Sequence, residues 1–245
     1  MEPIGRRRAL GVIGGVCAGA VVAACSSSTK PSAAPPGTAA PATSGSTAGP
    51  ATCRLAPEVT QGPFFLTDHP DASNLVQNRP GRHLALTLAV VDQQCAAVPG
   101  AKVDVWHCDA AGVYAGVGNG PGGGQAGGDF AAATRATPDT WLQGYQVAGA
   151  DGTVKFTTIY PGWYPGRAVH IHMKVFVGGD HVHTGQLFFP DPLSARVFAQ
   201  PPYRGAPDTP NRSDSIFRES GSAALLAPAA RGQGFTAHAQ LVVRT

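Results

Sequence analysis

Charged side chains are scarce in this 245-residue chain. Lys, Arg, Asp and Glu make up only 13% of it, whereas it contains 32 glycines and 22 prolines. A helical bundle or coiled coil needs periodic runs of good helix formers, which glycine and proline interrupt. The composition therefore excludes those classes and favours short strands joined by turns.

The chain also lacks a concentrated positive charge. Its formal net charge is +3, and its basic run is limited to Arg6, Arg7 and Arg8. Proteins that bind nucleic acid through its phosphates present a stronger and more localised basic surface. We therefore expect no nucleic-acid partner.

No apolar run has the length of a comfortable membrane-spanning helix. The stretch from Ala9 to Ala24 is short and rich in glycine, and three arginines precede it. We expect residues 1–24 to be a signal peptide resembling the twin-arginine type. The stretch ends at Cys25 in a sequence that resembles the lipobox of bacterial lipoproteins, so lipid on Cys25 would be the only membrane attachment. An ordinary signal peptide with a chance cysteine is the alternative.

The sequence divides the chain into three parts. After the leader, residues 25–52 consist mostly of Ser, Ala, Thr, Gly and Pro, which bury too little apolar area to offset the entropy of ordering. We expect a solvated tether there and one folded domain over residues 53–245. This organisation predicts an exported lipoprotein on the outer face of the cytoplasmic membrane or on the cell surface.

Cysteine is also rare, with five in the chain. Cys17 would leave with the leader and Cys25 would carry lipid, so Cys53, Cys95 and Cys108 remain. Outside the cytoplasm two of these can form a disulfide. We favour Cys53 with Cys95, because the bridge would fasten the start of the domain to a polar turn. Pairing with Cys108 and three free thiols remain open.

Strand patterns recur through the domain. In residues 83–92, Leu84, Leu86, Leu88 and Val90 alternate with smaller or polar side chains, and this period of two is typical of a strand. Further strands are expected at residues 102–108, 153–159, 169–177, 185–189 and 237–245. The expected fold is all-β, an antiparallel sandwich of the transthyretin or immunoglobulin-like kind, with long irregular loops, and residues 191–235 are expected to be irregular.

Histidines and tyrosines are the candidate ligands for a metal. His170 and His172 are two residues apart in an expected strand, so their side chains project from one face and both could reach one ion. Two surface histidines would show the same spacing. His181 and His183 are expected in a hairpin turn, where a shared direction is not assured.

Two tyrosines occupy informative places. Tyr114 follows an expected strand, and Tyr164 comes shortly before the histidine pair. A tyrosine at a strand end is commonly a half-buried packing residue. A phenolate, however, is a hard anionic ligand that suits a strong Lewis acid such as Fe(III).

Four motifs in order carry a resemblance to a known family. They are TQGPF (60–64), AKVDVWHCDAAGVY (101–114), FTTIYPGWYPGRAVHIH (156–172) and TGQLFFPDP (184–192). Together they resemble the intradiol ring-cleavage dioxygenases, the non-haem Fe(III) enzymes that include catechol and protocatechuate dioxygenases, and most closely their extracellular single-domain branch. The resemblance extends through residues 202–217 and into the last strand.

The resemblance implies a function and a site. It implies one Fe(III) per chain, held by Tyr114, Tyr164, His170 and His172, and insertion of O2 into catechol-type diols to give muconate-type dicarboxylates. Tyr164 would also take a proton from the substrate. Arg167 would stabilise negative charge on the ring, although an ion pair that fastens the loop is the alternative.

Gln186 and Tyr160 are implied to bind substrate, with an ordinary strand role open for Gln186 and packing open for Tyr160. The substrate's identity and the oligomeric state stay undetermined. Two other functions remain: a binding module for phenolics or sugars without catalysis, and a zinc or copper protein that uses the four histidines His170, His172, His181 and His183.

Overall fold

A computed structural model of the protein describes residues 52–117 and 133–245, which belong to one compact unit. The expected signal peptide, the lipidation site Cys25 and the tether up to residue 51 lie outside the described residues. So does most of the glycine-rich stretch that follows Tyr114. In the described part of the chain, no helix is long and apolar enough to cross a membrane.

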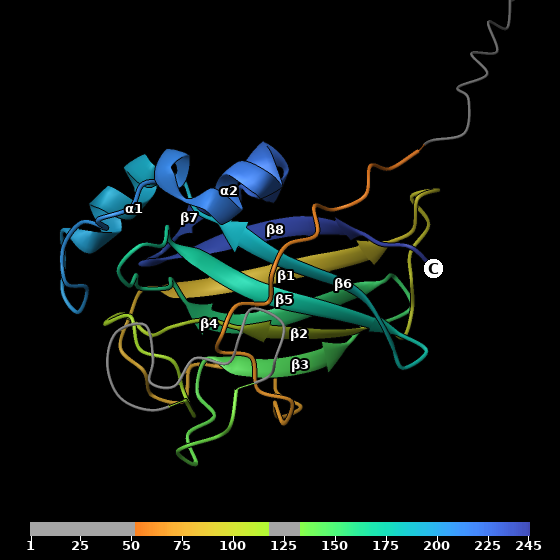
Figure 1. Ribbon diagram of the computed structural model, residues 1–245, viewed down its shortest axis with the longest axis horizontal. Coiled ribbons are helices and arrows are strands. Elements are labelled where there is room, and N and C mark those ends of the chain that lie inside the picture. Colours follow the sequence, from red (N-terminus) through yellow and green to blue (C-terminus); the bar gives the residue numbers. More distant parts are fainter. Residues whose placement is uncertain (1–51, 118–132) are drawn as a thin grey trace, which may run out of the picture. The chain divides into compact units, whose positions relative to one another are not determined.

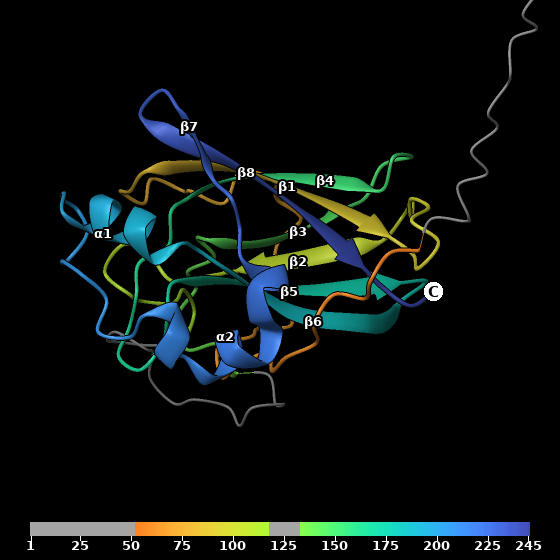
Figure 2. The same ribbon diagram turned by 90° about the horizontal axis from the view of Figure 1, so that it is seen from above.

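The described chain is built mainly of strands, as expected. The strands are β1 (His83–Val91), β2 (Lys102–Trp106), β3 (Gln143–Val147), β4 (Thr153–Ile159), β5 (His170–Val177), β6 (Asp180–Phe188), β7 (Ala229–Arg231) and β8 (Gly234–Val242). They form two four-stranded sheets, of order β4-β1-β8-β7 and β3-β2-β5-β6. Figure 2 shows these sheets as two layers.

One core fills the space between the two sheets. Leu84, Leu86, Leu88 and Val90 on β1 are at most 1% exposed, which confirms the expected alternation. They pack in one cluster with inward side chains of the other sheet, among them Ile171 and Val175 on β5. Burying a side chain of this size contributes about 1.5–3 kcal/mol, so these alternating positions fix which face of each strand points outward.

The pairing is antiparallel with one exception. β1 and β8 lie side by side in parallel, with Leu84 opposite Phe235 and Val91 opposite Val242. The expected sandwich was wholly antiparallel, and this expectation is wrong at that pair. Parallel neighbours need a long connection, and here most of the domain lies between β1 and β8 in the sequence.

Residues 191–235 are more regular than expected. They contain the helices α1 (Asp191–Phe198) and α2 (Ser215–Ser220), the 3-10 turns η1 (Asn211–Ser213) and η2 (Gly221–Ala224), and β7. Figure 1 shows both helices outside the strands. Phe217 of α2 packs on Phe188 of β6, at 5.1 Å between ring centroids, so this segment covers one edge of the second sheet.

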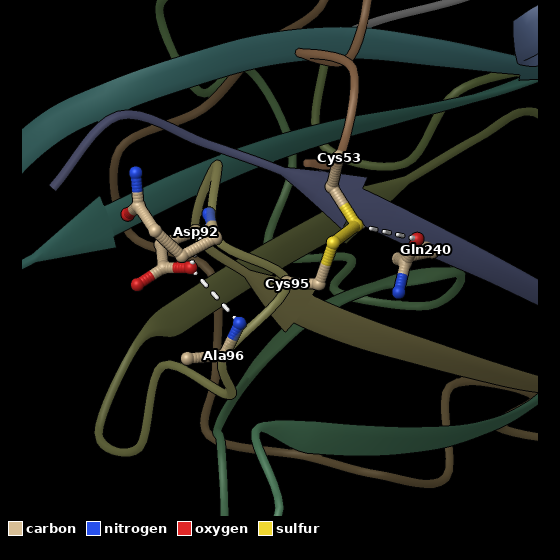
Figure 3. The surroundings of a disulfide bond; sticks show 6 residues. Cys53, Asp92, Cys95, Ala96 and Gln240 are labelled. Carbon is tan, nitrogen blue, oxygen red and sulfur yellow. Dashed lines mark hydrogen bonds between the residues drawn. A yellow bond between two sulfur atoms is a disulfide. The ribbon is translucent and has the colours of Figure 1, made fainter. Parts of the chain in front are cut away.

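A disulfide fastens the start of the described chain. It joins Cys53 to Cys95 in the turn after β1, with their Cα atoms 5.3 Å apart, and Cys108 is a buried free thiol. Figure 3 shows Asp92 beside the bridge, where its carboxylate accepts the Ala96 N–H at 2.9 Å. The bridge holds the segment that leads toward Gly62.

Candidate metal centre

The candidate site lies on the face of the second sheet that points away from the core. On β5, Ile171 and Met173 face the core, so the alternation turns His170 and His172 to the opposite face. The antiparallel register sets Trp106 of β2 and Gln186 of β6 directly beside His172. Loops cover this face, because both histidines are at most 2% exposed.

Two tyrosines from separate loops meet the two histidines. The Tyr114 hydroxyl lies 3.1 Å from His172 Nε2, and the Tyr164 hydroxyl lies 3.2 Å from His170 Nε2. The two Nε2 atoms are 3.0 Å apart. Phe64 covers Tyr114 with a stacked ring at 4.4 Å. The structure thus brings together the four side chains expected to bind a metal.

Both histidines present an uncharged ring to the cluster. His170 Nδ1–H donates to the Ala168 carbonyl at 2.6 Å, so in the neutral ring the lone pair is on Nε2, toward the cluster. Burial lowers the pKa of both His170 and His172 well below the ordinary value, and the charge of Arg167 adds to this. Neutral imidazole is the form that binds metal ions.

Both tyrosines, by contrast, stay protonated without a cation. Burial raises the pKa of Tyr164 to about 12 and that of Tyr114 well above its usual value. The phenols become anionic near neutral pH only beside a strong positive charge.

The donor set fits a single transition-metal ion. Donor atoms bound to one such ion at about 2.0–2.2 Å stand roughly 3 Å apart, as the measured separations do. No group of three His, Cys, Asp or Glu side chains within residues 52–117 and 133–245 has metal-binding geometry. A centre here therefore needs its tyrosines, and two phenolates with two imidazoles suit Fe(III) better than Zn(II) or Cu(II).

Arg167 connects the cluster to a polar network. Its Nη1 donates to the Tyr164 hydroxyl at 3.4 Å, its Nη2 to Gln186 Oε1, and its Nε to Asp214 at 2.9 Å. Burial alone would lower the pKa of Arg167, but Tyr164 and Asp214 raise it on balance. The guanidinium is therefore a fixed positive charge beside Tyr164. Its ion pair with Asp214 agrees with the alternative expected from the sequence, an ion pair that fastens the loop, and the role toward a substrate ring stays a prediction.

Gln186 reaches the site through this network. Its Nε2 donates to the Thr60 carbonyl at 3.0 Å while its Oε1 accepts from Arg167, so both ends of the amide bind protein groups. Gln186 is buried at 1% exposure. In this arrangement the amide holds Arg167 in place, and each end of the amide keeps the capacity for one further hydrogen bond.

Asp214 is the site residue that the sequence did not reveal. It is fully buried and accepts hydrogen bonds from Arg167 and from the backbone N–H groups of Ala168, Ile216 and Phe217. Its position before Ser215 is typical of a helix N-cap, which was the available signal. The motif shows the cap but not that the other carboxylate oxygen reaches 47 residues back to Arg167.

Tyr160 does not belong to the cluster. Its ring is fully buried in the main core, 4.4 Å from Phe189, and its hydroxyl is hydrogen-bonded to Ser194 at 2.8 Å. The substrate-binding role is corrected here to packing, because Tyr160 continues the alternation of Val154 and Phe156 on β4 and therefore faces the core.

His181 and His183 lie apart from the cluster. They belong to β6 and not to the turn, which is made by Gly178 and Gly179 at positive φ. His183 pairs with Val175 on the core side, whereas His181 donates to or accepts from Thr184 Oγ1 at 2.7 Å. The four histidines therefore do not converge on one ion.

A cleft of about 630 Å³ adjoins the cluster on the same face. Thr184 and Lys174 line it, each two residues from Gln186 or His172, together with Thr60 and Gln61 of the covering segment. The cleft meets the network at Thr60, whose carbonyl accepts from Gln186, and it is large enough for a small aromatic molecule.

The fold and the cluster define a strand-rich protein with a candidate mononuclear metal centre. A family model described as Dioxygenase matches residues 60–201. The chain is 31% identical to an intradiol ring-cleavage dioxygenase of Tetranychus urticae, with a TM-score of 0.71, covering 78% of this chain and 95% of that one. The chain belongs to the intradiol ring-cleavage dioxygenase family, as the sequence motifs indicated.

Other relatives differ in extent. The protocatechuate 3,4-dioxygenase beta chain of Burkholderia cepacia is 30% identical over 58% of this chain and 59% of its own length. The chlorocatechol 1,2-dioxygenase of Rhodococcus opacus is 26% identical over 53% of this chain and 54% of its own. The chain thus spans just over half the length of these curated relatives.

Proposed function

We propose that the protein is an Fe(III)-dependent intradiol dioxygenase that converts catechol-type diols and O2 into muconate-type dicarboxylates. The observation that carries the proposal is the meeting of Tyr114, Tyr164, His170 and His172 at donor separations of 3.0–3.5 Å. Family membership supplies the reaction class, and the four side chains would hold the ion.

When bound, Fe(III) supplies the Lewis acidity that ionises the phenols and a catechol, and the redox chemistry that lets the ring react with O2. The protein's groups do the rest. Tyr164 would accept a proton at Oη from a catechol hydroxyl, because burial raises the pKa of its phenol to about 12 and so makes its phenolate a strong base. The buried surroundings of Tyr114 and His172 exclude bulk water from the cluster.

Arg167 is the proposed electrostatic partner of the substrate. Its Nη1 lies 3.4 Å from both the Tyr164 hydroxyl and His170 Nε2, so a ring placed beside these groups meets the guanidinium. Negative charge that develops on the ring is stabilised by this fixed cation, and a preorganised charge of this kind contributes most where water is excluded.

The test is oxygen uptake by the Fe(III)-loaded protein with catechol, protocatechuate, hydroxyquinol and larger phenolics. With ¹⁸O2, we expect one dicarboxylate product that carries two labelled oxygen atoms. Uptake that gives a product with one labelled oxygen, or binding of every diol without uptake, would overturn the proposal. The second outcome would favour a binding module without catalysis.

We also propose that the protein acts outside the cytoplasm as a lipoprotein anchored at Cys25. The disulfide between Cys53 and Cys95 supports this, because such bonds persist in oxidising compartments. Metabolic labelling with a fatty acid should label the exported protein and not its Cys25→Ala variant. Equal labelling of both would contradict the anchor.

A further inference from the structure

His172 differs from His170 in how its ring is held. His170 Nδ1 donates to a backbone carbonyl, but His172 Nδ1 is buried without a hydrogen-bond partner in the described part of the chain. Histidines that bind metals usually donate the second ring N–H to a neighbour, which fixes the ring. Something else must therefore orient His172.

The ring of Trp106 lies flat against His172. Their centroids are 5.0 Å apart and their planes differ by only 8°, so the two rings are stacked almost parallel. The bare backbone of Gly62 also closes on the imidazole at Cε1, since a Cβ there would lie 3.1 Å from that atom. Trp106 thus packs on the face of the ring, and Gly62 limits its movement at Cε1.

Trp106 is in turn held by its neighbours and not by a hydrogen bond. It is 1% exposed, and its Nε1 has no partner among the described residues. Phe65 packs at 4.9 Å and His69 at 5.6 Å between ring centroids. A tryptophan without a hydrogen bond keeps its orientation only while the rings around it stay in place.

His69 lies between Trp106 and a buried carboxylate of β2. Its side chain is 1% exposed, and its Nδ1 lies 3.4 Å from a carboxylate oxygen of Asp104, which the alternation of β2 places on the same face as Trp106. Asp104 also contacts Lys102 at 3.4 Å. Neither ring nitrogen of His69 has a hydrogen-bond partner among the described residues, so burial and packing hold the ring beside Asp104, and His69 in turn limits the movement of Trp106.

We infer that Trp106, backed by His69 and Asp104, is the positioning residue that orients His172 for metal binding. This inference rests on the proposed Fe(III) site. Among the ring contacts that Trp106 and His69 make within the described residues, the contact with His172 is the one that reaches a candidate ligand. We therefore expect their effect to act mainly through the ring of His172. Loss of a supporting residue beside a metal ligand typically weakens metal affinity 10–100-fold.

The experiment compares Trp106→Leu and His69→Ala with Trp141→Leu. Trp141 is also a buried tryptophan with an Nε1 that has no partner among the described residues, but it packs in a separate cluster that contains none of the four ligands. Iron affinity is measured by competition with nitrilotriacetate, followed through the visible phenolate-to-Fe(III) band. Thermal unfolding of the metal-free proteins measures the structural cost.

We expect Trp106→Leu to weaken iron binding at least 10-fold and His69→Ala to weaken it several-fold, with Trp141→Leu within twofold of the unsubstituted protein. Trp106→Phe, which keeps a stacked ring, should recover most of the affinity and guards against misfolding of the leucine variant. Equal affinity in the Trp106 and Trp141 variants would overturn the inference. Failure of the unsubstituted protein to bind iron would overturn the proposed function and this inference with it.

Discussion

Asp214 holds the guanidinium of Arg167 in position through an ion pair. The carboxylate is fully buried, and its contact with Arg167 Nε is 2.9 Å long. The other oxygen caps α2 through Ile216 and Phe217. One side chain therefore ties the helix to the guanidinium, and a small displacement of either is transmitted to Tyr164.

Replacing Asp214 by Asn tests the ion pair with Arg167, because it exchanges one carboxylate oxygen for an amide nitrogen. Asn retains the capping oxygen but removes the negative charge, so Arg167 should be held less firmly and kcat should fall about 10-fold or more with iron content unchanged. Asp208→Asn is the matched control, because Asp208 is exposed and accepts hydrogen bonds from the Gly166 N–H at 3.3 Å and the Thr209 hydroxyl at 2.8 Å, neither of which belongs to the cluster. Similar kcat values for the two variants would contradict the assignment.

His107 is a second buried residue whose charge matters. Its Nδ1–H donates to the Cys108 carbonyl, and its Nε2 accepts from Thr158 on the other sheet at 2.7 Å. Burial lowers the pKa of His107 to about 4. Because the unfolded chain binds the proton near pH 6.5, stability falls as the pH drops from about 6.5 toward 4.

The expected contribution of this one group is a loss of about 2 kcal/mol between neutral pH and pH 5. Urea unfolding at pH 7.5 and pH 5 should therefore show a smaller pH dependence in His107→Gln than in the unsubstituted protein. The exposed His238 on β8 provides the control variant, His238→Gln. A pH dependence that His107→Gln leaves unchanged would show that the ring is not held neutral.

At the scale of elements, the first segment of the domain runs from the disulfide to the four candidate metal ligands. Cys53 is bonded to Cys95, Val59 donates to the Thr184 carbonyl at 3.0 Å, and Gly62 closes on His172. The disulfide therefore limits the freedom of a segment that covers the site, and its removal should affect both stability and the site.

Cys53→Ser with Cys95→Ser should lower the free energy of unfolding by up to about 4 kcal/mol, from the chain entropy of a loop with a sequence separation of 42 residues. Urea unfolding with and without dithiothreitol measures it. The reductant should destabilise the unsubstituted protein to the level of the double variant and leave the variant unchanged. A midpoint insensitive to the reductant would contradict the role of the bridge.

Elements with strong alternation were predictable from the sequence, and others were not. Residues 83–92 carry buried side chains at every second position, because one face of β1 meets the core. Residues 169–177 alternate apolar side chains that face the core with histidines on the other face, which loops also bury. β3, with the sequence QGYQV, and the three-residue β7 lack such a pattern. β3 is held by its pairing with β2, a long-range contact that no local pattern encodes.

In the site, too, local patterns were predictable from the sequence and long-range contacts were not. The spacing of His170 and His172 predicted a shared face, and the family motifs picked out Tyr114 and Tyr164. The partners of these residues depend on contacts between distant segments, as with Asp214 and Arg167 or His69 and Trp106. The misplacement of Tyr160 has the same origin, since a motif cannot show which of two nearby tyrosines turns into the core.

At the scale of the whole described unit, the two faces of the second sheet have different tasks. The inner face packs against the first sheet as an apolar core. The outer face carries buried polar side chains, including Asp104, Gln143, His172 and Gln186, under a cover of loops. Buried polar groups are costly unless they are paired or bind a ligand. The buried polar side chains of the second sheet therefore lie on the same face as the proposed metal site.

The most direct test of the central claim is the iron content and visible spectrum of the protein beside Tyr114→Phe and Tyr164→Phe. We predict one Fe(III) per chain and a red-brown phenolate charge-transfer band in the unsubstituted protein. Each variant should lose iron affinity or show a weaker and shifted band, because one phenolate is gone. Tyr160→Phe, which removes a hydroxyl in the core, should leave the band unchanged. Unaltered iron content and colour in both ligand variants would contradict the iron-tyrosinate site.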